Sequence, residues 1–214
     1  MIVNERIVAY INSLDRGNSP ICNTIEKEAI EDDVPIIRKE MGNLLKVLLG
    51  LKQPQSILEV GTAVGYSSIL MSENMPEGCI IDTIENYDKR IPIARNNFKR
   101  AGKEDCIRLI EGDAMEVLKE LEGPYDFIFM DAAKGQYIHF LPDILRLLEP
   151  GGLLVSDNIL QDGDIVESKY AVTRRNRTIH NRMREYLYAL THHEELETVI
   201  LPVADGVTLS TKKM

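Results

Sequence analysis

The sequence has few cysteines, no tryptophan and no long apolar run. Its 3 cysteines in 214 residues, Cys22, Cys79 and Cys106, are too few and too scattered for a disulfide framework or a zinc cluster. No stretch approaches the roughly 20 consecutive apolar residues that cross a bilayer, and Glu5 and Arg6 interrupt the N-terminal run that could resemble a signal sequence. We expect reduced thiols in a cytoplasmic protein without membrane association.

Positive charge is also scarce overall. The chain has 34 Asp and Glu against 25 Lys and Arg, which gives a formal net charge of −9 and a pI of about 5.0. Nonspecific binding of nucleic acid comes mostly from cations that neutralise phosphates, so this balance disfavours a protein that coats nucleic acid. One segment differs: residues 169–186 contain six Lys and Arg and one acid, a local net charge of +5.

The chain contains no internal repeat or low-complexity linker, and 44% of its residues are apolar. Its length favours a single domain over residues 1–214, with a helical N-terminal extension to about residue 50. In that extension Asn23 and Glu26 match a capping box, and Pro35 is typical of the start of a second helix. Apolar residues then recur at helical spacing to residue 48.

From residue 56 onward, short apolar runs alternate with helical segments. Five runs cover residues 57–60, 80–84, 107–110, 127–130 and 153–155. This alternation predicts an α/β fold with a mostly parallel sheet and helices on both faces. Two further strands, 198–202 and 206–211, flank the turn dipeptide Asp205-Gly206, so we expect seven strands with a C-terminal antiparallel hairpin at the edge.

Ligands bind such sheets beyond the carboxyl ends of the strands, and three of these ends carry a consistent pattern. Glycines at 61 and 65 follow the first strand, in a spacing that differs from the G-x-G-x-x-G of dinucleotide sites. Glu85 ends the second strand, where an acid can accept from ribose hydroxyls, and Asp113 with Ala114 follows the third, where they can contact an adenine. The alternatives are that the glycine loop is a tight turn that binds nothing and that Glu85 is a solvated carboxylate. Taken together, the three strand ends predict a site for a nucleoside cofactor.

The fourth and fifth strands are followed by oxygen-bearing side chains. Asp131 follows one strand, and Asp157 and Asn158 follow the other. Two carboxylates and an amide oxygen at neighbouring strand ends are ligands suited to Mg²⁺. The alternative is that Asp131 caps a helix and the Asp157-Asn158 pair forms a turn.

In order along the chain, the sequence contains E-V-G-T-A-V-G-Y-S, T-I-E, G-D-A, M-D-A-A-K-G-Q-Y and S-D-N. With these motifs, residues of about 35–211 resemble the metal-dependent O-methyltransferases of the catechol and caffeoyl-CoA type. The resemblance implies a Rossmann-like class I methyltransferase fold, S-adenosylmethionine as cofactor, Mg²⁺ or Mn²⁺, and a homodimer. Where animal catechol enzymes have aromatic residues beside the metal ligand, this chain has Ala132 and Ala133; these would grip a small flat catechol poorly.

The same resemblance assigns roles to individual residues. Ser67 would hold the methionine carboxylate, Glu85 the ribose, and Asp113 with Ala114 the adenine. Ile37 would close over the cofactor, and Lys134 would be the base near the acceptor hydroxyl, with a solvent-facing lysine as the alternative. The expected sets are therefore Lys134 and Asp131 for catalysis; Ile37, Glu59, Gly61, Ser67, Glu85, Asp113, Ala114 and Asp131 for the cofactor; and Asp131, Asp157 and Asn158 for the metal.

The basic segment indicates the acceptor. Arg174, Arg175 and Arg177 open the helix expected at the mouth of the site, and an anticodon loop brings phosphates and an unstacked base. Within the family, the chain most resembles the bacterial tRNA 5-hydroxyuridine methyltransferases, which make 5-methoxyuridine at the wobble position. The resemblance rests on the length of the chain and on the motifs P-I-I-R-K-E-M-G, D-A-A-K-G-Q-Y and L-P-V-A-D-G-V-T-L-S. A solvated helix face is the alternative for the arginines.

Three other functions remain open. A small-molecule catechol or phenolic O-methyltransferase would share the cofactor and metal ligands. A noncatalytic RNA-binding or cofactor-sensing protein could use the same fold. An NAD-dependent oxidoreductase is the most remote of the three, because the glycine spacing does not match its pyrophosphate loop.

Overall fold

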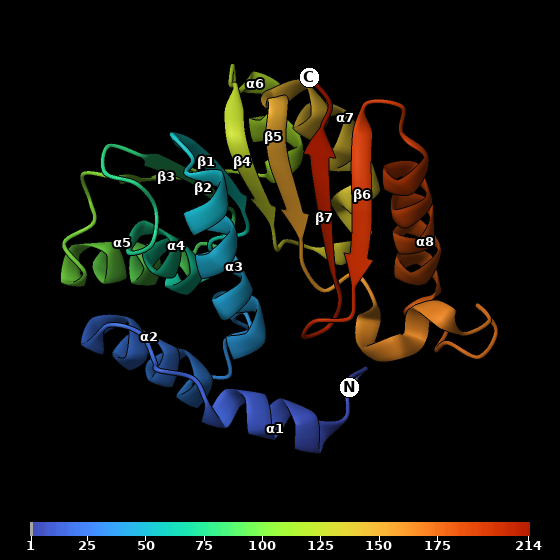
Figure 1. Ribbon diagram of the computed structural model, residues 1–214, viewed down its shortest axis with the longest axis horizontal. Helices are drawn as coiled ribbons and strands as arrows, with labels where there is room; N and C mark the ends of the chain where they lie inside the picture. Colours follow the sequence, from blue (N-terminus) through green and yellow to red (C-terminus); the bar gives the residue numbers. More distant parts are fainter. Residues whose placement is uncertain (1) are drawn as a thin grey trace.

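The structure is a computed structural model that describes residues 2–214, and its centre is one mixed sheet (Figure 1). The strands lie in the order β3-β2-β1-β4-β5-β7-β6. Their bounds are Ser56–Val60 (β1), Ile80–Glu85 (β2), Ile107–Glu111 (β3), Tyr125–Met130 (β4), Leu148–Ser156 (β5), Leu196–Leu201 (β6) and Val207–Lys212 (β7). The first five strands pair in parallel and β7 pairs antiparallel with β5 and β6, which confirms the predicted fold class and hairpin.

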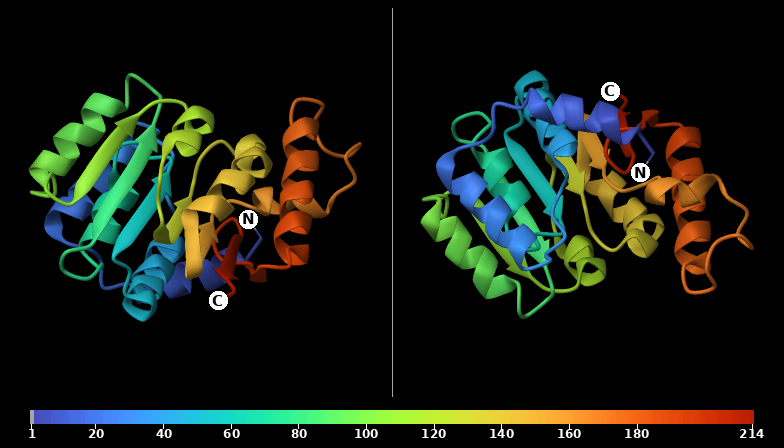
Figure 2. Two further views of the ribbon diagram at one scale, coloured as in Figure 1. Left: turned by 90° about the horizontal axis from the view of Figure 1, so that it is seen from above. Right: turned by 90° about the horizontal axis from the view of Figure 1, so that it is seen from below.

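Helices cover both faces of the sheet, as the two views of Figure 2 show. The α-helices are α1 (Glu5–Ser13), α2 (Pro20–Glu31), α3 (Lys39–Lys52), α4 (Tyr66–Ser72), α5 (Ile91–Arg100), α6 (Ala114–Glu120), α7 (Tyr137–Leu147) and α8 (Arg177–His192). Two short 3₁₀ helices, η1 (Lys134–Gln136) and η2 (Gln161–Val166), follow β4 and β5. Each therefore begins just beyond the carboxyl end of a strand.

Alternation along the strands divides the core into two layers. Ile57 of β1 packs on one face with side chains of α2 to α5, and the adjacent Leu58 packs on the other with side chains of α6 to α8. Successive side chains of a strand point to opposite faces, so a strand buried on both sides reads as one continuous apolar run. This burial holds the strand ends in a fixed arrangement.

The N-terminal helices differ in detail from the expectation. The second helix begins at Pro20, where Ser19 caps it by accepting from the Cys22 amide at 3.2 Å, so the capping box at Asn23 and Glu26 was wrong. The third helix begins at Lys39 and not at Pro35. Residues 34–38 instead form a non-helical strap, in which Ile37 is buried.

Two further expectations concern thiols and membranes. The three cysteines are free; Cys22 and Cys79 are buried and Cys106 is half-buried. Across residues 2–214, none of the helices has both the length and the apolar character needed to cross a bilayer. Burial raises the pKa of Cys22 to about 12, so this thiol stays protonated and acts as a small apolar side chain.

Candidate functional site

A pocket of about 680 Å³ lies at the carboxyl ends of the parallel strands. This volume lies within the range of small-molecule and cofactor sites. The strap contributes Pro35, Ile36 and Ile37. The rest of the lining comes from the ends of the parallel strands and the turns and helix starts that follow them, and includes Gly61, Ser67, Glu85, Asp113, Ala114, Asp131, Ala132, Ala133, Lys134 and Asn158. The structure therefore brings most of the predicted site residues to one cavity.

The turn after β1 depends on a close backbone approach at Gly61. This residue has φ of +108°, and a Cβ atom there would lie 2.3 Å from the carbonyl oxygen of Asp131. The amides of Gly61 and Thr62 both donate to the carbonyl oxygen of Ile84 at 3.1 Å. A residue without a side chain is thus required for β1 and β4 to meet at the pocket.

Glu59 lies behind the pocket lining. It is fully buried and accepts hydrogen bonds from Ser67, Ser68 and Thr83. Burial raises the pKa of Glu59 to about 7, although these three hydroxyl bonds act in the opposite direction. Glu59 is not part of the pocket lining, and it contacts the pocket through Ser67, which it holds by a hydrogen bond and which does line the cavity.

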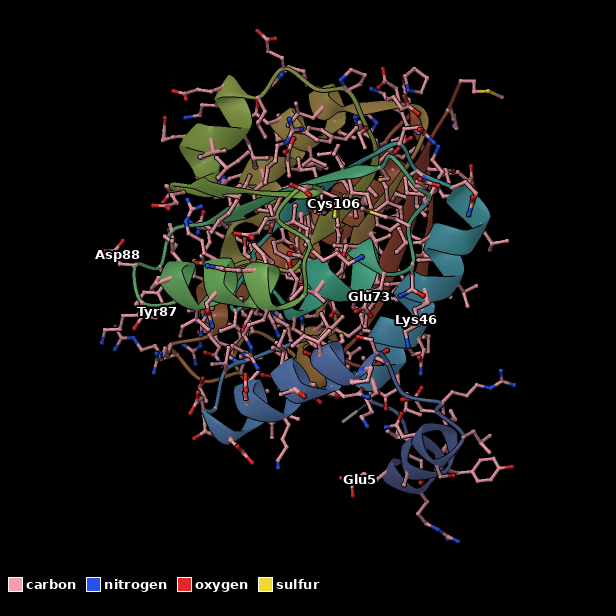
Figure 3. All side chains as sticks on the ribbon, turned by 90° about the vertical axis from the view of Figure 1, so that its left-hand side faces the viewer. Glu5, Lys46, Glu73, Tyr87, Asp88 and Cys106 are labelled. Atoms are coloured by element: carbon pink, nitrogen blue, oxygen red, sulfur yellow. The ribbon has the colours of Figure 1, made fainter. Side chains whose placement is uncertain are left out.

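Glu85 is buried at the end of β2 and organises two loops. Its Oε2 accepts from the amide of Ala63 at 2.7 Å, and its Oε1 accepts from the amides of Asn86 and Tyr87 at 3.0 and 2.9 Å. Figure 3 shows Tyr87 and Asp88 on the loop that projects beyond this strand. A carboxylate offers about four acceptor positions, so within the described chain one remains for a ligand hydroxyl.

Asp113 and Ala114 line the pocket where β3 ends. The Asp113 side chain caps α6 by accepting from the Met115 amide at 2.8 Å. It is exposed, and its capping bond uses Oδ1 only, so the other carboxylate oxygen faces no competing helix amide. An adenine contact from Asp113 is compatible with this arrangement and stays a prediction.

The strap closes one side of the pocket. Ile37 is buried, and the neighbouring Arg38 forms a 3.2 Å ion pair with Asp162 in η2. The strap is thereby linked to η2, which follows Asn158 in the chain. This position agrees with the expectation that Ile37 closes over a cofactor, which stays a prediction.

Asp131, Asp157 and Asn158 lie together at the ends of β4 and β5. The Asn158 side-chain amide donates to Asp131 at 2.9 Å, and the Asn158 backbone amide donates to Asp157 at 2.7 Å. Burial raises the pKa of both carboxyl groups, and the nearby charge of Asp131 raises the pKa of Asp157 further. A buried carboxylate, Asp157, held beside the half-buried carboxylate of Asp131 attracts a positive charge.

This donor set fits a hard divalent cation. Carboxylate oxygens and an amide oxygen are ligands of Mg²⁺ and Mn²⁺, and a half-turn of the Asn158 amide would present its oxygen in place of its nitrogen. In the part of the chain that the structure describes, no group of three or more His, Cys, Asp or Glu could hold a metal. Any cation here would therefore depend on the Asn158 amide as well as on the two acids.

Lys134 is held by a residue that the sequence did not single out. Its Nζ lies 3.1 Å from Oδ2 of Asp205, a buried acid whose Oδ1 accepts from the backbone amide of Asp162. In the sequence Asp205-Gly206 indicates only a turn, and the pairing spans 71 residues. Asp205 orients the lysine ammonium group at the wall of the pocket.

The arginine segment lies beside the pocket and not in its lining. Arg182 of α8 donates to the carbonyl oxygen of Gly135 at 3.1 Å, next to Lys134. Arg174 and Arg175 are exposed, and Arg177 is half-buried and donates to the carbonyl oxygen of Val172 at 3.4 Å. His180, which the sequence left without a role, is buried in α8 and contacts the Glu167 carbonyl oxygen at 3.1 Å.

Comparisons with known proteins agree with this geometry. A family model described as O-methyltransferase matches residues 16–213. The chain is 36% identical to a catechol O-methyltransferase of Niastella koreensis over 77% of this chain and 70% of that protein. It is 34% identical to caffeoyl-CoA O-methyltransferase 2 of Populus trichocarpa over 78% of this chain and 71% of that protein. The structure of the SAH-bound Podospora anserina methyltransferase PaMTH1 superposes with a TM-score of 0.87 at 27% identity, covering 98% and 95% of the two chains.

The Gly61 contact predicts a large effect of one methyl group. Gly61→Ala should lower the free energy of unfolding by about 3 kcal/mol, from backbone strain together with the clash at the Asp131 carbonyl. Gly78→Ala is the matched control, because Gly78 also has positive φ but has open space around its Cβ position; it should lose only about 1 kcal/mol. Urea unfolding measures both values. Equal losses would contradict the proposed role of the close approach.

Proposed function

Because the chain belongs to the O-methyltransferase family, as an S-adenosylmethionine-dependent enzyme of the catechol and caffeoyl-CoA type, we propose that its acceptor is 5-hydroxyuridine at the wobble position of tRNA. The product would be 5-methoxyuridine. Methyl transfer from a sulfonium requires an oxygen nucleophile held in line with the S–CH₃ bond, and a phenol-like or enol-like hydroxyl is the more reactive kind.

The observation that carries the proposal is the unpaired basic segment. Five of the eight arginines elsewhere form an ion pair with a carboxylate: Arg38, Arg95, Arg100, Arg108 and Arg146. Within residues 2–214, the six cations of the segment 169–186 form no such pair, although the chain carries a net charge of −9. Unneutralised cations beside the acceptor end of a pocket favour a polyanionic substrate.

A divalent cation completes the proposal. Asp131, Asp157 and the Asn158 amide would hold it, and when bound it would lower the pKa of an acceptor hydroxyl that it contacts. A 5-hydroxyuridine offers the neighbouring C4 carbonyl as a second oxygen. Lys134 would take the hydroxyl proton at Nζ once its ammonium group, which pairs with Asp205, has released a proton to solvent; that release would be favoured by a divalent cation bound beside it.

The second candidate is a small-molecule catechol or phenolic O-methyltransferase. The named catechol and caffeoyl-CoA relatives favour it, since they share the family and more than two thirds of the chain. Ala132 and Ala133 at the pocket wall speak against a tight grip on a flat ring. The two candidates share the cofactor and metal ligands and differ in whether the basic segment contributes.

The predicted homodimer remains a proposal. The α1 helix has no buried residue, and Ile7, Tyr10, Ile11 and Leu14 form an apolar stripe along one side of it, each between 47% and 66% exposed. A second copy of this chain could cover that stripe. Sedimentation equilibrium of the purified protein tests this; a monomer at micromolar concentration would contradict it.

The basic segment can be tested by charge removal. Arg174→Ala combined with Arg175→Ala should weaken binding of an anticodon stem-loop about 10-fold, or about 1.4 kcal/mol. The slope of log Kd against log salt should fall by about 0.7 for each lost phosphate contact. Stem-loop methylation should fall in parallel, while methylation of a free catechol is retained.

Arg6→Ala combined with Arg16→Ala is the matched control, because it removes the same charge from exposed positions near α1. This control should bind and methylate the stem-loop as the unaltered protein does. If both double variants behaved alike, the segment 169–186 would have no part in RNA recognition, and the small-molecule candidate would be favoured.

The metal site can be tested by one isosteric change. Asp157→Asn should abolish restoration of activity by Mg²⁺ after EDTA treatment and lower methyl transfer at least about 100-fold, equivalent to about 2.7 kcal/mol. Asp126→Asn is the control, since Asp126 is a buried acid at the opposite end of β4. Thermal shifts with Mg²⁺ alone give a second measurement: the cation should stabilise the control but not Asp157→Asn. Full activity of Asp157→Asn would contradict the metal site.

A further inference from the structure

We propose that Tyr170 is a stacking platform for a nucleobase adjacent to the methylated uridine, with Lys169 and Arg177 neutralising the flanking phosphates. The inference rests on the proposed RNA substrate and extends it to a site outside the pocket. Tyr170 lies in the segment between η2 and α8, which Figure 1 shows at the same end of the sheet as the carboxyl ends of β4 and β5.

Tyr170 is a large aromatic side chain held in water on an ordered turn. It is 74% exposed, whereas Val172, two residues later, is buried. The turn is held by hydrogen bonds from the amides of Ala171 and Val172 to the Ser168 carbonyl oxygen, at 2.8 and 3.3 Å. Buried His180 of α8 contacts the Glu167 carbonyl oxygen on the other side. The exposure of the ring is therefore built into the turn and does not come from a loose end.

Two cations lie against this ring. The Lys169 Nζ atom is 5.2 Å and the Arg177 Cζ atom is 5.8 Å from the ring centroid. Arg177 is fixed by its bond to the Val172 carbonyl oxygen, so it keeps its place when the ring is used by a ligand. An exposed cation–aromatic contact is weaker than a base stack, so a base can displace the Lys169 ammonium group from the ring face toward a phosphate while Arg177 stays in place.

The position of the turn matches the acceptor end of the pocket. The first turns of α8, which follow the Tyr170 turn, contact η1, where a Cβ on Gly135 would lie 3.4 Å from Ile179. Lys134 and Gln136 on either side of Gly135 line the pocket. An RNA loop whose target base enters this pocket therefore passes over the segment 168–177.

A stacking platform has a physical reason at this place. Extruding a base from a loop deprives its neighbour of a stacking partner, and proteins that bind single-stranded RNA replace that partner with an aromatic side chain. One such stack contributes about 1–3 kcal/mol, which is about 5- to 150-fold in Kd. One exposed aromatic ring with two cations that have no carboxylate partner among residues 2–214 is the composition of such sites.

The test uses the full-length protein and an anticodon stem-loop containing 5-hydroxyuridine. Tyr170→Ala should raise the Kd for the stem-loop 5- to 150-fold, and Tyr170→Trp should restore binding to within about 3-fold of the unaltered protein. Tyr188→Ala is the matched control; Tyr188 is a 65% exposed tyrosine of α8 stacked on His192, and its removal should leave binding and methylation unchanged.

A second measurement separates stacking from a structural role. Stem-loops with an abasic site on the 5′ or the 3′ side of the target should bind the unaltered protein more weakly at one of the two positions. The same abasic stem-loop should bind Tyr170→Ala no more weakly than the intact stem-loop does, because the stack is already lost. If the abasic site and Tyr170→Ala each weakened binding independently, so that their losses of affinity added up at both positions, the platform would be overturned.

The outcomes also separate this inference from the proposed function. If the unaltered protein did not methylate the stem-loop at all, the proposed RNA substrate would be wrong, and the platform with it. If the unaltered protein methylated the stem-loop and Tyr170→Ala bound it equally well, only the platform would be wrong.

Discussion

Two carboxylates at neighbouring strand ends, one buried and one half-buried, form the constraint on which the site depends. The register of β4 and β5 pairs Met130 with Ser156, so Asp131 and Asp157, the next residues of each strand, must lie side by side. Burial of like charges is costly unless a cation, a proton or hydrogen bonds compensate for it. The chain supplies the Asn158 amide and Lys134 nearby, and the remaining deficit of positive charge is the physical basis of the proposed divalent-cation site.

Much of the arrangement follows from the sequence because strand ends can be located from apolar runs. Gly61, Glu85, Asp131 and Asn158 each follow or end such a run, and a parallel sheet collects these positions at one edge. The position of Asp205 beside Lys134 does not follow, because the pair joins residues 71 positions apart and the local signal is only a turn. The start of α2 was missed for a related reason: Ser19 and Pro20 together determine it, and the sequence offers a competing box at Asn23.

In the proposed function, recognition of the acceptor and the chemistry of methyl transfer use separate parts of the molecule. Five of the eight arginines outside the segment 169–186 pair with carboxylates, while among residues 2–214 the six cations of the segment form no such pair. The pocket carries the features that O-methyltransferases of this family share, so it cannot by itself distinguish a catechol from a nucleoside. The surface outside it, from Lys169 to Arg184, is where a macromolecular acceptor would be recognised.

The central claim is that the acceptor is a wobble 5-hydroxyuridine. Nucleoside analysis of tRNA from a strain that lacks the gene for this chain tests it most directly. The account predicts that 5-hydroxyuridine accumulates and that 5-methoxyuridine disappears, with recovery when the gene is restored. An unchanged nucleoside profile would contradict the account and assign the enzyme to a small phenolic substrate.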